Sequence, residues 1–186
     1  MKKNKMSFET SFCAGFVAGN TSKAVETFFG FADLDYYKQN LSEVVMFCYK
    51  REIYKENDPS NVFVFYTAFS SFLEVCYCLH EKSKKWKVKE ALCSETVFHF
   101  SSLSKEGYDN PFLVFEKAFG EITFEEFELF VSQILELSLS PSAGDPDFDL
   151  TTPYIHLIKM LDATERIREK GVQKIRKTKP INAVTE

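Results

Sequence analysis

Residues 59–80 read PSNVFVFYTAFSSFLEVCYCLH, and this stretch decides the fold class. Its apolar residues recur three or four positions apart, at Val62, Phe65, Tyr66, Phe69, Phe72, Leu73, Cys76 and Leu79. This spacing places one broad apolar face on an α-helix, which is typical of a helix at the centre of a bundle. The run 62–66 is rich in β-favouring residues, but about twenty residues without a turn signal are several times the length of a usual strand. We therefore predict a central helix here.

The same stretch is the best candidate for a membrane-spanning helix. It is a poor one, because lipid disfavours its polar residues Ser60, Asn61, Thr67, Ser70, Ser71 and Glu74. A basic start over residues 1–5 and an apolar run over 12–19 faintly resemble a secretory signal, but Glu9 interrupts it. The five cysteines are odd in number and lack a Cys-x-x-Cys spacing, which suits a reducing compartment. We therefore expect a cytoplasmic chain with no membrane contact.

Phenylalanine is abundant, with 20 residues among 186. Burying one Phe is worth roughly 1.5–3 kcal/mol, so a buried set of this size supplies a large share of the free energy of folding. Seven Gly and six Pro are few for this length, which disfavours a sandwich or barrel with many tight turns. We predict an all-α, single-domain bundle of about five to seven helices with a Phe-rich core over residues 1–176. Residues 177–186 are expected to form a frayed C-terminal tail.

Local signals set the expected helix boundaries in the first half of the chain. Asp33 can cap a helix that runs to about Glu56. The turn over residues 57–59 then starts the central helix, because Asp caps a helix and Pro is tolerated in its first turn. After that helix, residues 82–89 are expected to form an exposed, lysine-rich connection.

The second half of the chain carries the clearest helix signal. Thr123 and Glu126 match a capping box, and Ile122 and Phe127 occupy the positions of a hydrophobic staple. A helix is therefore predicted from about Phe124 to Leu137. Other helices are expected from Ser94 to Gly107, from Asn110 to Gly120 and from Thr152 to beyond Gly171, with a loop over residues 141–146.

Two patterns resemble metal sites. Cys76, Cys78 and His80 have a Cys-x-Cys-x-His spacing, but on a helix Cys78 points nearly opposite to the other two, and zinc usually takes four ligands. Residues 120–127 resemble the end of an EF-hand loop. The earlier ligand positions of such a loop fall on side chains that offer calcium no oxygen, namely Phe115, Lys117 and Phe119. We therefore predict no metal and no cofactor.

The sequence contains no catalytic motif. It lacks a Gly-x-Ser-x-Gly elbow, a His-Glu-x-x-His helix, a phosphate-binding loop and a dinucleotide fingerprint. His99 is flanked by Phe98 and Phe100, and His156 shares a helix face with Thr152 and Lys159, which is a small polar cluster or a solvated surface. A Cys–His pair brought together only by folding stays an open alternative. We assign no catalytic residue and favour a non-enzymatic role.

Charge is unevenly distributed along a chain whose net charge is −4. Residues 121–149 hold eight acidic residues and neither Lys nor Arg, whereas residues 165–179 hold seven basic residues against two acidic ones. The basic residues are Arg166, Arg168, Lys170, Lys174, Arg176, Lys177 and Lys179. They form a candidate interaction surface for nucleic acid or an acidic protein, or they are a solvated helix end.

These features favour a helical module that binds or regulates another protein, or that associates with itself as a homodimer. The Phe surplus and the split charge motivate this hypothesis. One alternative is a ligand-binding or enzymatic domain with an apolar, Phe-lined pocket. A further alternative is a nucleic-acid-associated protein that uses the basic C-terminal segment, although that segment lacks interleaved aromatic residues for stacking.

Overall fold

The computed structural model describes residues 21–50, 52–55, 57–58, 60–89, 101–140 and 148–175. The helices within these ranges are α2 (Thr21–Phe31), α3 (Leu34–Tyr49), α4 (Ser60–Lys82), α6 (Lys105–Asp109), α7 (Phe112–Glu121), α8 (Phe124–Leu139) and α9 (Thr151–Lys170). Two short strands, β1 (Trp86–Val88) and β2 (Val172–Lys174), pair antiparallel. The predicted all-α bundle is confirmed, and the number of described helices lies in the predicted range.

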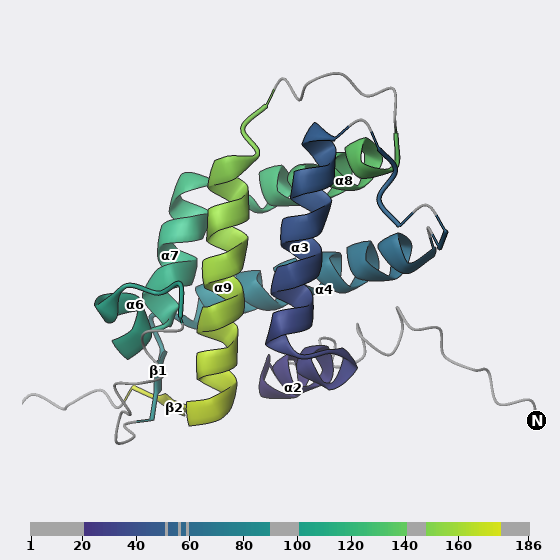
Figure 1. Cartoon of the computed structure of the whole chain (residues 1–186). Coiled ribbons are helices and arrows are strands. Elements are labelled where there is room, and N and C mark those ends of the chain that lie inside the picture. The colour runs from purple at the N-terminus through teal and green to yellow at the C-terminus, as the bar shows by residue number, and fades with distance from the viewer. Residues whose placement is uncertain are drawn as a thin grey trace, which may run out of the picture.

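The helices form two crossing layers (Figure 1). α3, α9 and α7 stand side by side, and α4 and α8 run across behind them. α4 contacts α8, α7 and α2, while α9 contacts both α3 and α7. α4 is therefore the central helix that the sequence predicts.

The core forms where these layers meet. Seven of the eight predicted inward-facing residues of α4 are buried, and Tyr66 is the partly exposed member of that set. Among the described residues, α4 is also the one helix long and apolar enough to cross a membrane, judged by length and composition alone. Just over half of its most apolar window is buried inside the fold. Packing against α2, α7 and α8 explains the apolar character of this helix.

Stacked aromatic rings fill the centre of the core. The Phe28 ring stacks on the Tyr37 ring with 4.0 Å between their centroids, and on the Phe72 ring with 4.7 Å. Phe69 meets the rings of Phe72 and Tyr37 edge to face, at 5.7 Å and 6.1 Å. These rings come from α2, α3 and α4, so aromatic contacts hold three helices together. The predicted Phe-rich core is confirmed.

α3 begins at the predicted cap but ends earlier than predicted. The Asp33 carboxylate accepts a backbone N–H of the first turn at 2.8 Å, whereas the helix stops at Tyr49 rather than near Glu56. A tertiary contact explains the difference, because the backbone N–H of Tyr54 donates to the carbonyl of Ser138 in α8 and the Tyr54 side chain is buried. No local sequence pattern signals this contact.

The helix expected over Ser94–Gly107 is wrong over residues 101–104 and right over 105–107, which belong to α6, while residues 90–100 lie outside the described part of the chain. Residues 101–104 are not helical, and α6 begins at Lys105, where the Ser104 hydroxyl caps the helix by accepting the N–H of Gly107 at 3.2 Å. Gly107 therefore lies inside a helix rather than at its end. Ser102 is held in a non-helical position because its backbone N–H and its hydroxyl both donate to Asp162 of α9.

The end of α9 also differs from the prediction. The helix stops at Lys170 and does not continue, because Gly171 has a φ of 69°, a backbone conformation that favours glycine. β2 follows at once and pairs with β1, with Trp86 opposite Lys174. The expected connection over residues 82–89 therefore contains a strand.

The capping box of α8 is confirmed, and so are the bounds of α7 and α8 to within two residues. α8 begins with the predicted capping box, in which the side chains of Thr123 and Glu126 each bond the other's backbone N–H. The helix runs to Leu139 rather than Leu137, and α7 ends one residue after Gly120. The predicted loop over 141–146 and the predicted tail over 177–186 lie outside the described residues.

Candidate functional site

The cysteine residues of α3 and α4 are placed for packing. Cys76 is buried, and burial holds the pKa of its thiol well above the ordinary value. Burial also raises the pKa of the Cys48 and Cys78 thiols, so all three thiols stay protonated near neutral pH and are poor nucleophiles. Within the described ranges, no three His, Cys, Asp or Glu side chains are placed to hold a metal ion. Cys13, Cys93 and His99 lie outside those ranges.

His156 joins α9 to the end of α7. Its Nε2 lies 2.9 Å from Oε2 of Glu121, and its ring meets the Phe127 ring edge to face with 6.3 Å between centroids. The His156 side chain is buried, whereas Glu121 is half exposed and also faces Lys117 at 3.9 Å. This contact joins α9 to α7, and of the residues that form it Glu121 and Lys117 face the solvent.

Asp162 is a second interhelical anchor. Its nearly fully buried carboxylate pairs with Lys38 of α3 through one oxygen. Its other oxygen accepts the backbone N–H and the hydroxyl of Ser102, at 2.7 Å and 2.6 Å. Because three donors already occupy this carboxylate, it holds α3, α9 and the chain before α6 together.

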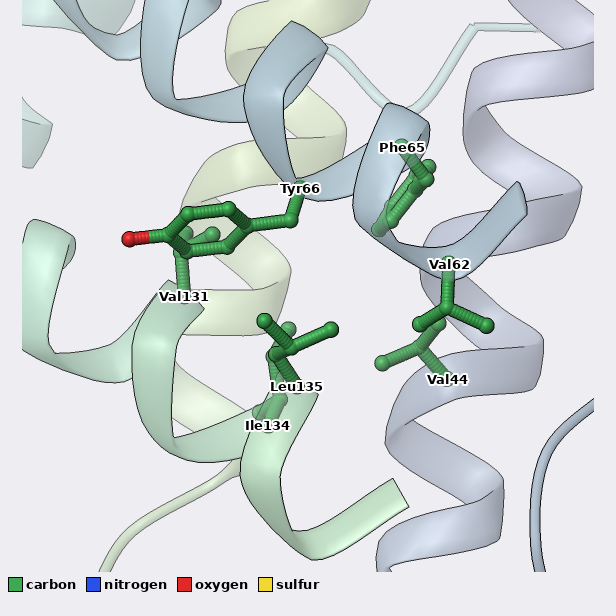
Figure 2. Close-up of a pocket in the computed structure, with 7 residues that line it drawn as sticks. All are labelled: Val44, Val62, Phe65, Tyr66, Val131, Ile134 and Leu135. Atoms are coloured by element: carbon green, nitrogen blue, oxygen red, sulfur yellow. The ribbon is translucent and has the colours of Figure 1, made fainter. Parts of the chain in front are cut away.

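An apolar depression lies between α3, α4 and α8 (Figure 2). It is lined by Val44, Val62, Phe65, Tyr66, Val131, Ile134 and Leu135. Its volume is about 170 Å³, part of which is open to solvent, and it has no room inside for even one water molecule. Drug-sized ligands occupy pockets of roughly 300–1,000 Å³, so this depression cannot enclose an apolar ligand.

One outward-facing surface combines exposed aromatic residues with acidic ones. We call it the α4–α8 face and define it by Phe63, Tyr66, Glu74 and Tyr77 of α4 with Phe124, Glu128 and Leu135 of α8. At one end, the Phe63 ring contacts Tyr66, which lies beside Leu135 at the apolar depression (Figure 2). At the other end, the Tyr77 ring packs against Phe124 with 5.2 Å between centroids. Phe63 is 62% exposed and Tyr77 is 42% exposed.

Two carboxylates lie between the aromatic ends of this face. Glu74 and Glu128 are both exposed. The pKa of Glu74 is raised, first by partial burial and then by the nearby charge of Glu128. Residues 121–149 contain no Lys or Arg, and α4 contains none before Lys82, so neither helix neutralises this pair along the face.

The apolar periodicity of α4 did not identify this face, although a weaker signal was present. Phe63 and Glu74 are 11 residues apart, which is about three helical turns, and Tyr77 follows one turn later. These residues therefore share the side of α4 opposite the buried stripe. The position of Glu128 beside Glu74 depends on how α4 and α8 pack, and no sequence signal gives it.

Two of the predicted basic residues have partners inside the protein. The Arg166 guanidinium lies 3.9 Å from the centroid of the Tyr108 ring, and its side chain is only 11% exposed. The Arg168 guanidinium lies over the Phe29 ring at 4.7 Å. Each arginine also pairs with a glutamate of α9. The last predicted basic residues lie outside the described part of the chain, namely Arg176, Lys177 and Lys179.

The remaining two, Lys170 and Lys174, also lie over aromatic rings, those of Tyr108 at 5.8 Å and Trp86 at 5.9 Å. They belong to a surface that the sequence pattern did not reveal. The pairing of β1 with β2 brings the lysine-rich residues 82–89 beside the end of α9. We call the following set the basic ribbon: Lys84, Lys85, Lys87, Lys89, Lys170 and Lys174. Residues 82–89 and 170–175 contain no acidic residue. Figure 1 shows the ribbon at the end of the molecule where α9 ends, away from α8.

No protein-family model matches this chain, and no curated protein or solved structure is significantly similar to it. The geometry and charge of the α4–α8 face and of the basic ribbon are therefore the features of this chain that bear on its function.

Proposed function

We propose that this chain is a non-catalytic protein-interaction module that binds a basic, amphipathic helix of another protein on its α4–α8 face. The observation that carries the proposal is the order of side chains across that face. Exposed aromatic residues stand at its two ends, and Glu74 and Glu128 lie between them. Aromatic residues are enriched at protein interfaces and dominate their hot spots. A helix with an apolar stripe flanked by Lys or Arg matches both the rings and the carboxylates.

Electrostatics favours a basic partner over a second copy of the chain. In a symmetric dimer through this face, the same surface meets itself, so the carboxylates of Glu74 and Glu128 face like charges. Such an arrangement is strongly unfavourable. A basic helix instead neutralises both carboxylates and removes the repulsion that contributes to the raised pKa of Glu74. The proposed partner is therefore a different protein.

The remaining features of the fold are consistent with a rigid binding scaffold in the cytoplasm. Cys48, Cys76 and Cys78 are free thiols, which suits a reducing compartment. The buried polar groups Asp162 and His156 bond to neighbouring elements and hold them together. A rigid scaffold of this kind lowers the entropic cost of presenting a docking surface.

Binding of designed peptides tests the proposal. The probe is a synthetic helix of about five turns, roughly 18 residues, with Leu along one stripe and Lys on both sides of it. We expect micromolar affinity by calorimetry. We expect Phe63→Ser and Glu128→Lys each to weaken binding about tenfold or more, because each removes one of the two matching features.

Two control variants on α8 distinguish binding at this face from a general attraction of the basic peptide to an acidic protein. Leu129 is 57% exposed and Glu136 is exposed, but both lie on another side of α8, about 80° or more around the helix from Glu128 and about 100° or more from Phe124 and Leu135. Leu129→Ser and Glu136→Lys should therefore bind the peptide as the natural chain does. Equal losses in the control variants would overturn the proposal, and so would equal binding of a peptide with Glu in place of every Lys.

A further inference from the structure

We propose that the basic ribbon binds the sugar–phosphate backbone of a nucleic acid, independently of base sequence. This site is separate from the α4–α8 face and uses different residues. Three observations support it. The lysines in and beside β1 point outward, the two segments that form the ribbon contain no acidic residue, and the apolar side chains lie on the core side.

The ribbon presents a row of lysines on its outer side. In β1, Lys87 is exposed whereas Trp86 and Val88 are half-buried and buried, so alternate residues point outward. Hydrogen bonds from Lys89 N–H to the Gly171 carbonyl and from Ile175 N–H to the Lys85 carbonyl extend the paired ladder by one residue at each end. Lys85, Lys87 and Lys89 therefore follow one another on the outer side.

The spacing of this row suits a phosphate backbone. Alternate residues of a strand lie about 6.6 Å apart, which is about two nucleotide steps of 3.4 Å. Lys174 lies opposite Trp86 and over its ring, at 5.9 Å from the centroid, so it adds positive charge at the Trp86 face of the ribbon and is not part of the outer row. α8 and its acidic residues lie at the other end of the molecule from the ribbon (Figure 1), where salt screens their charge, because the Debye length is about 8 Å at physiological salt.

The composition of the surface favours nucleic acid over a protein or a membrane. Lys is depleted at protein–protein interfaces, whereas Lys and Arg supply the phosphate contacts of nucleic-acid-binding proteins. Trp86, Val88 and Val172 pack against the core. Among residues 82–89 and 170–175, which contain the ribbon, Ile175 is the one exposed large apolar side chain, which offers a lipid bilayer little to bury.

Fluorescence anisotropy with a labelled oligothymidylate and with a labelled DNA duplex tests the proposal on the full chain. Affinity should fall steeply between about 50 mM and 200 mM salt. The triple variant K85Q/K87Q/K89Q should bind at least about tenfold more weakly, and its log–log salt slope for the single strand should be shallower by about 2, because three phosphate contacts are lost. The triple Lys→Arg variant should keep both the affinity and the slope.

A charge-matched control removes three exposed lysines elsewhere. K50Q/K105Q/K117Q loses the same net charge and should bind as the natural chain does. Circular dichroism checks that each variant is folded, and the single K87Q variant replaces the triple if the triple is not. Equal loss in the control, no binding at low salt, or competition by polyglutamate as effective as by oligonucleotide would each overturn the proposal. Binding of the chain to phosphatidylserine vesicles that is as strong as its binding to DNA would overturn the proposal as well.

Discussion

Tyr37 caps the end of α2 and stacks on the same residue that it caps, Phe28. The Tyr37 hydroxyl donates to the Phe28 carbonyl at 2.9 Å, and the two ring centroids lie 4.0 Å apart. This carbonyl is one of the last four of α2, which have no partner within the helix. Burial raises the pKa of Tyr37 above its ordinary value, so the hydroxyl keeps the proton that it donates.

Removing that hydroxyl should destabilise the protein while the core stays packed. Tyr37→Phe keeps the ring but removes this buried hydrogen bond, and we expect the free energy of unfolding to fall by about 0.5–1.5 kcal/mol. Urea denaturation measures the change. The neighbouring Tyr36→Phe is the control and should be nearly neutral, because Tyr36 is only half-buried. Equal stability of Tyr37→Phe and the natural chain would show that the cap is unimportant.

Removing the Asp162 carboxylate should lower the stability of the protein more than removing an exposed carboxylate does. Asp162→Ala leaves Lys38 and two donors of Ser102 without their acceptor, at a cost of about 1–3 kcal/mol in the free energy of unfolding. Asp162→Asn keeps one acceptor oxygen and should lose less. Amide hydrogen exchange should also quicken at Ser102 in the Ala variant. Unchanged exchange there would contradict the anchoring role.

Gly171 should resist substitution. Its φ of 69° and ψ of 169° lie in a region that is essentially restricted to glycine. Gly171→Ala should therefore lower the free energy of unfolding by about 1–3 kcal/mol. Thermal unfolding measures this loss, and Gly120→Ala is the control, because Gly120 lies within α7 with open space around it. A Gly171→Ala variant as stable as the control would mean that α9 can end without this turn.

Glu74→Gln should stabilise the protein at neutral pH. The pKa of Glu74 is raised in the folded state, so the folded chain binds this proton more tightly than the unfolded chain does. Ionised Glu74 therefore lowers stability at pH 7, and this penalty disappears as the pH falls to about 4 and below, where both states are protonated. We expect a gain of up to about 0.5 kcal/mol at pH 7 that shrinks at acidic pH. A gain that persists unchanged below pH 4 would rule out charge as its origin.

The sequence predicts those parts of the fold that local chemistry decides. The capping box at Thr123 and Glu126 and the apolar stripe of α4 lie within one helix each, so periodicity and capping rules are sufficient to find them. The early end of α3 is different in kind. It depends on Tyr54 reaching Ser138, two residues that no short pattern connects.

The same distinction applies to the surfaces. That Phe63 and Tyr77 point away from the core follows from their positions in α4, but the place of Glu128 beside Glu74 follows only from helix packing. Likewise, residues 82–89 show their lysines in the sequence, but their union with Lys174 requires a strand pairing between distant segments. Sequence reasoning finds the charged and aromatic residues, and tertiary structure decides which of them act together.

The central claim is that the α4–α8 face docks a basic helix, and an NMR titration of the labelled chain with the Leu/Lys peptide tests it most directly. We predict that the largest amide shift changes fall at Phe63, Glu74, Tyr77 and Glu128, and that they saturate together. Changes centred on the opposite side of α8, around Leu129, would contradict the claim, and so would small changes spread evenly over the exposed acidic residues.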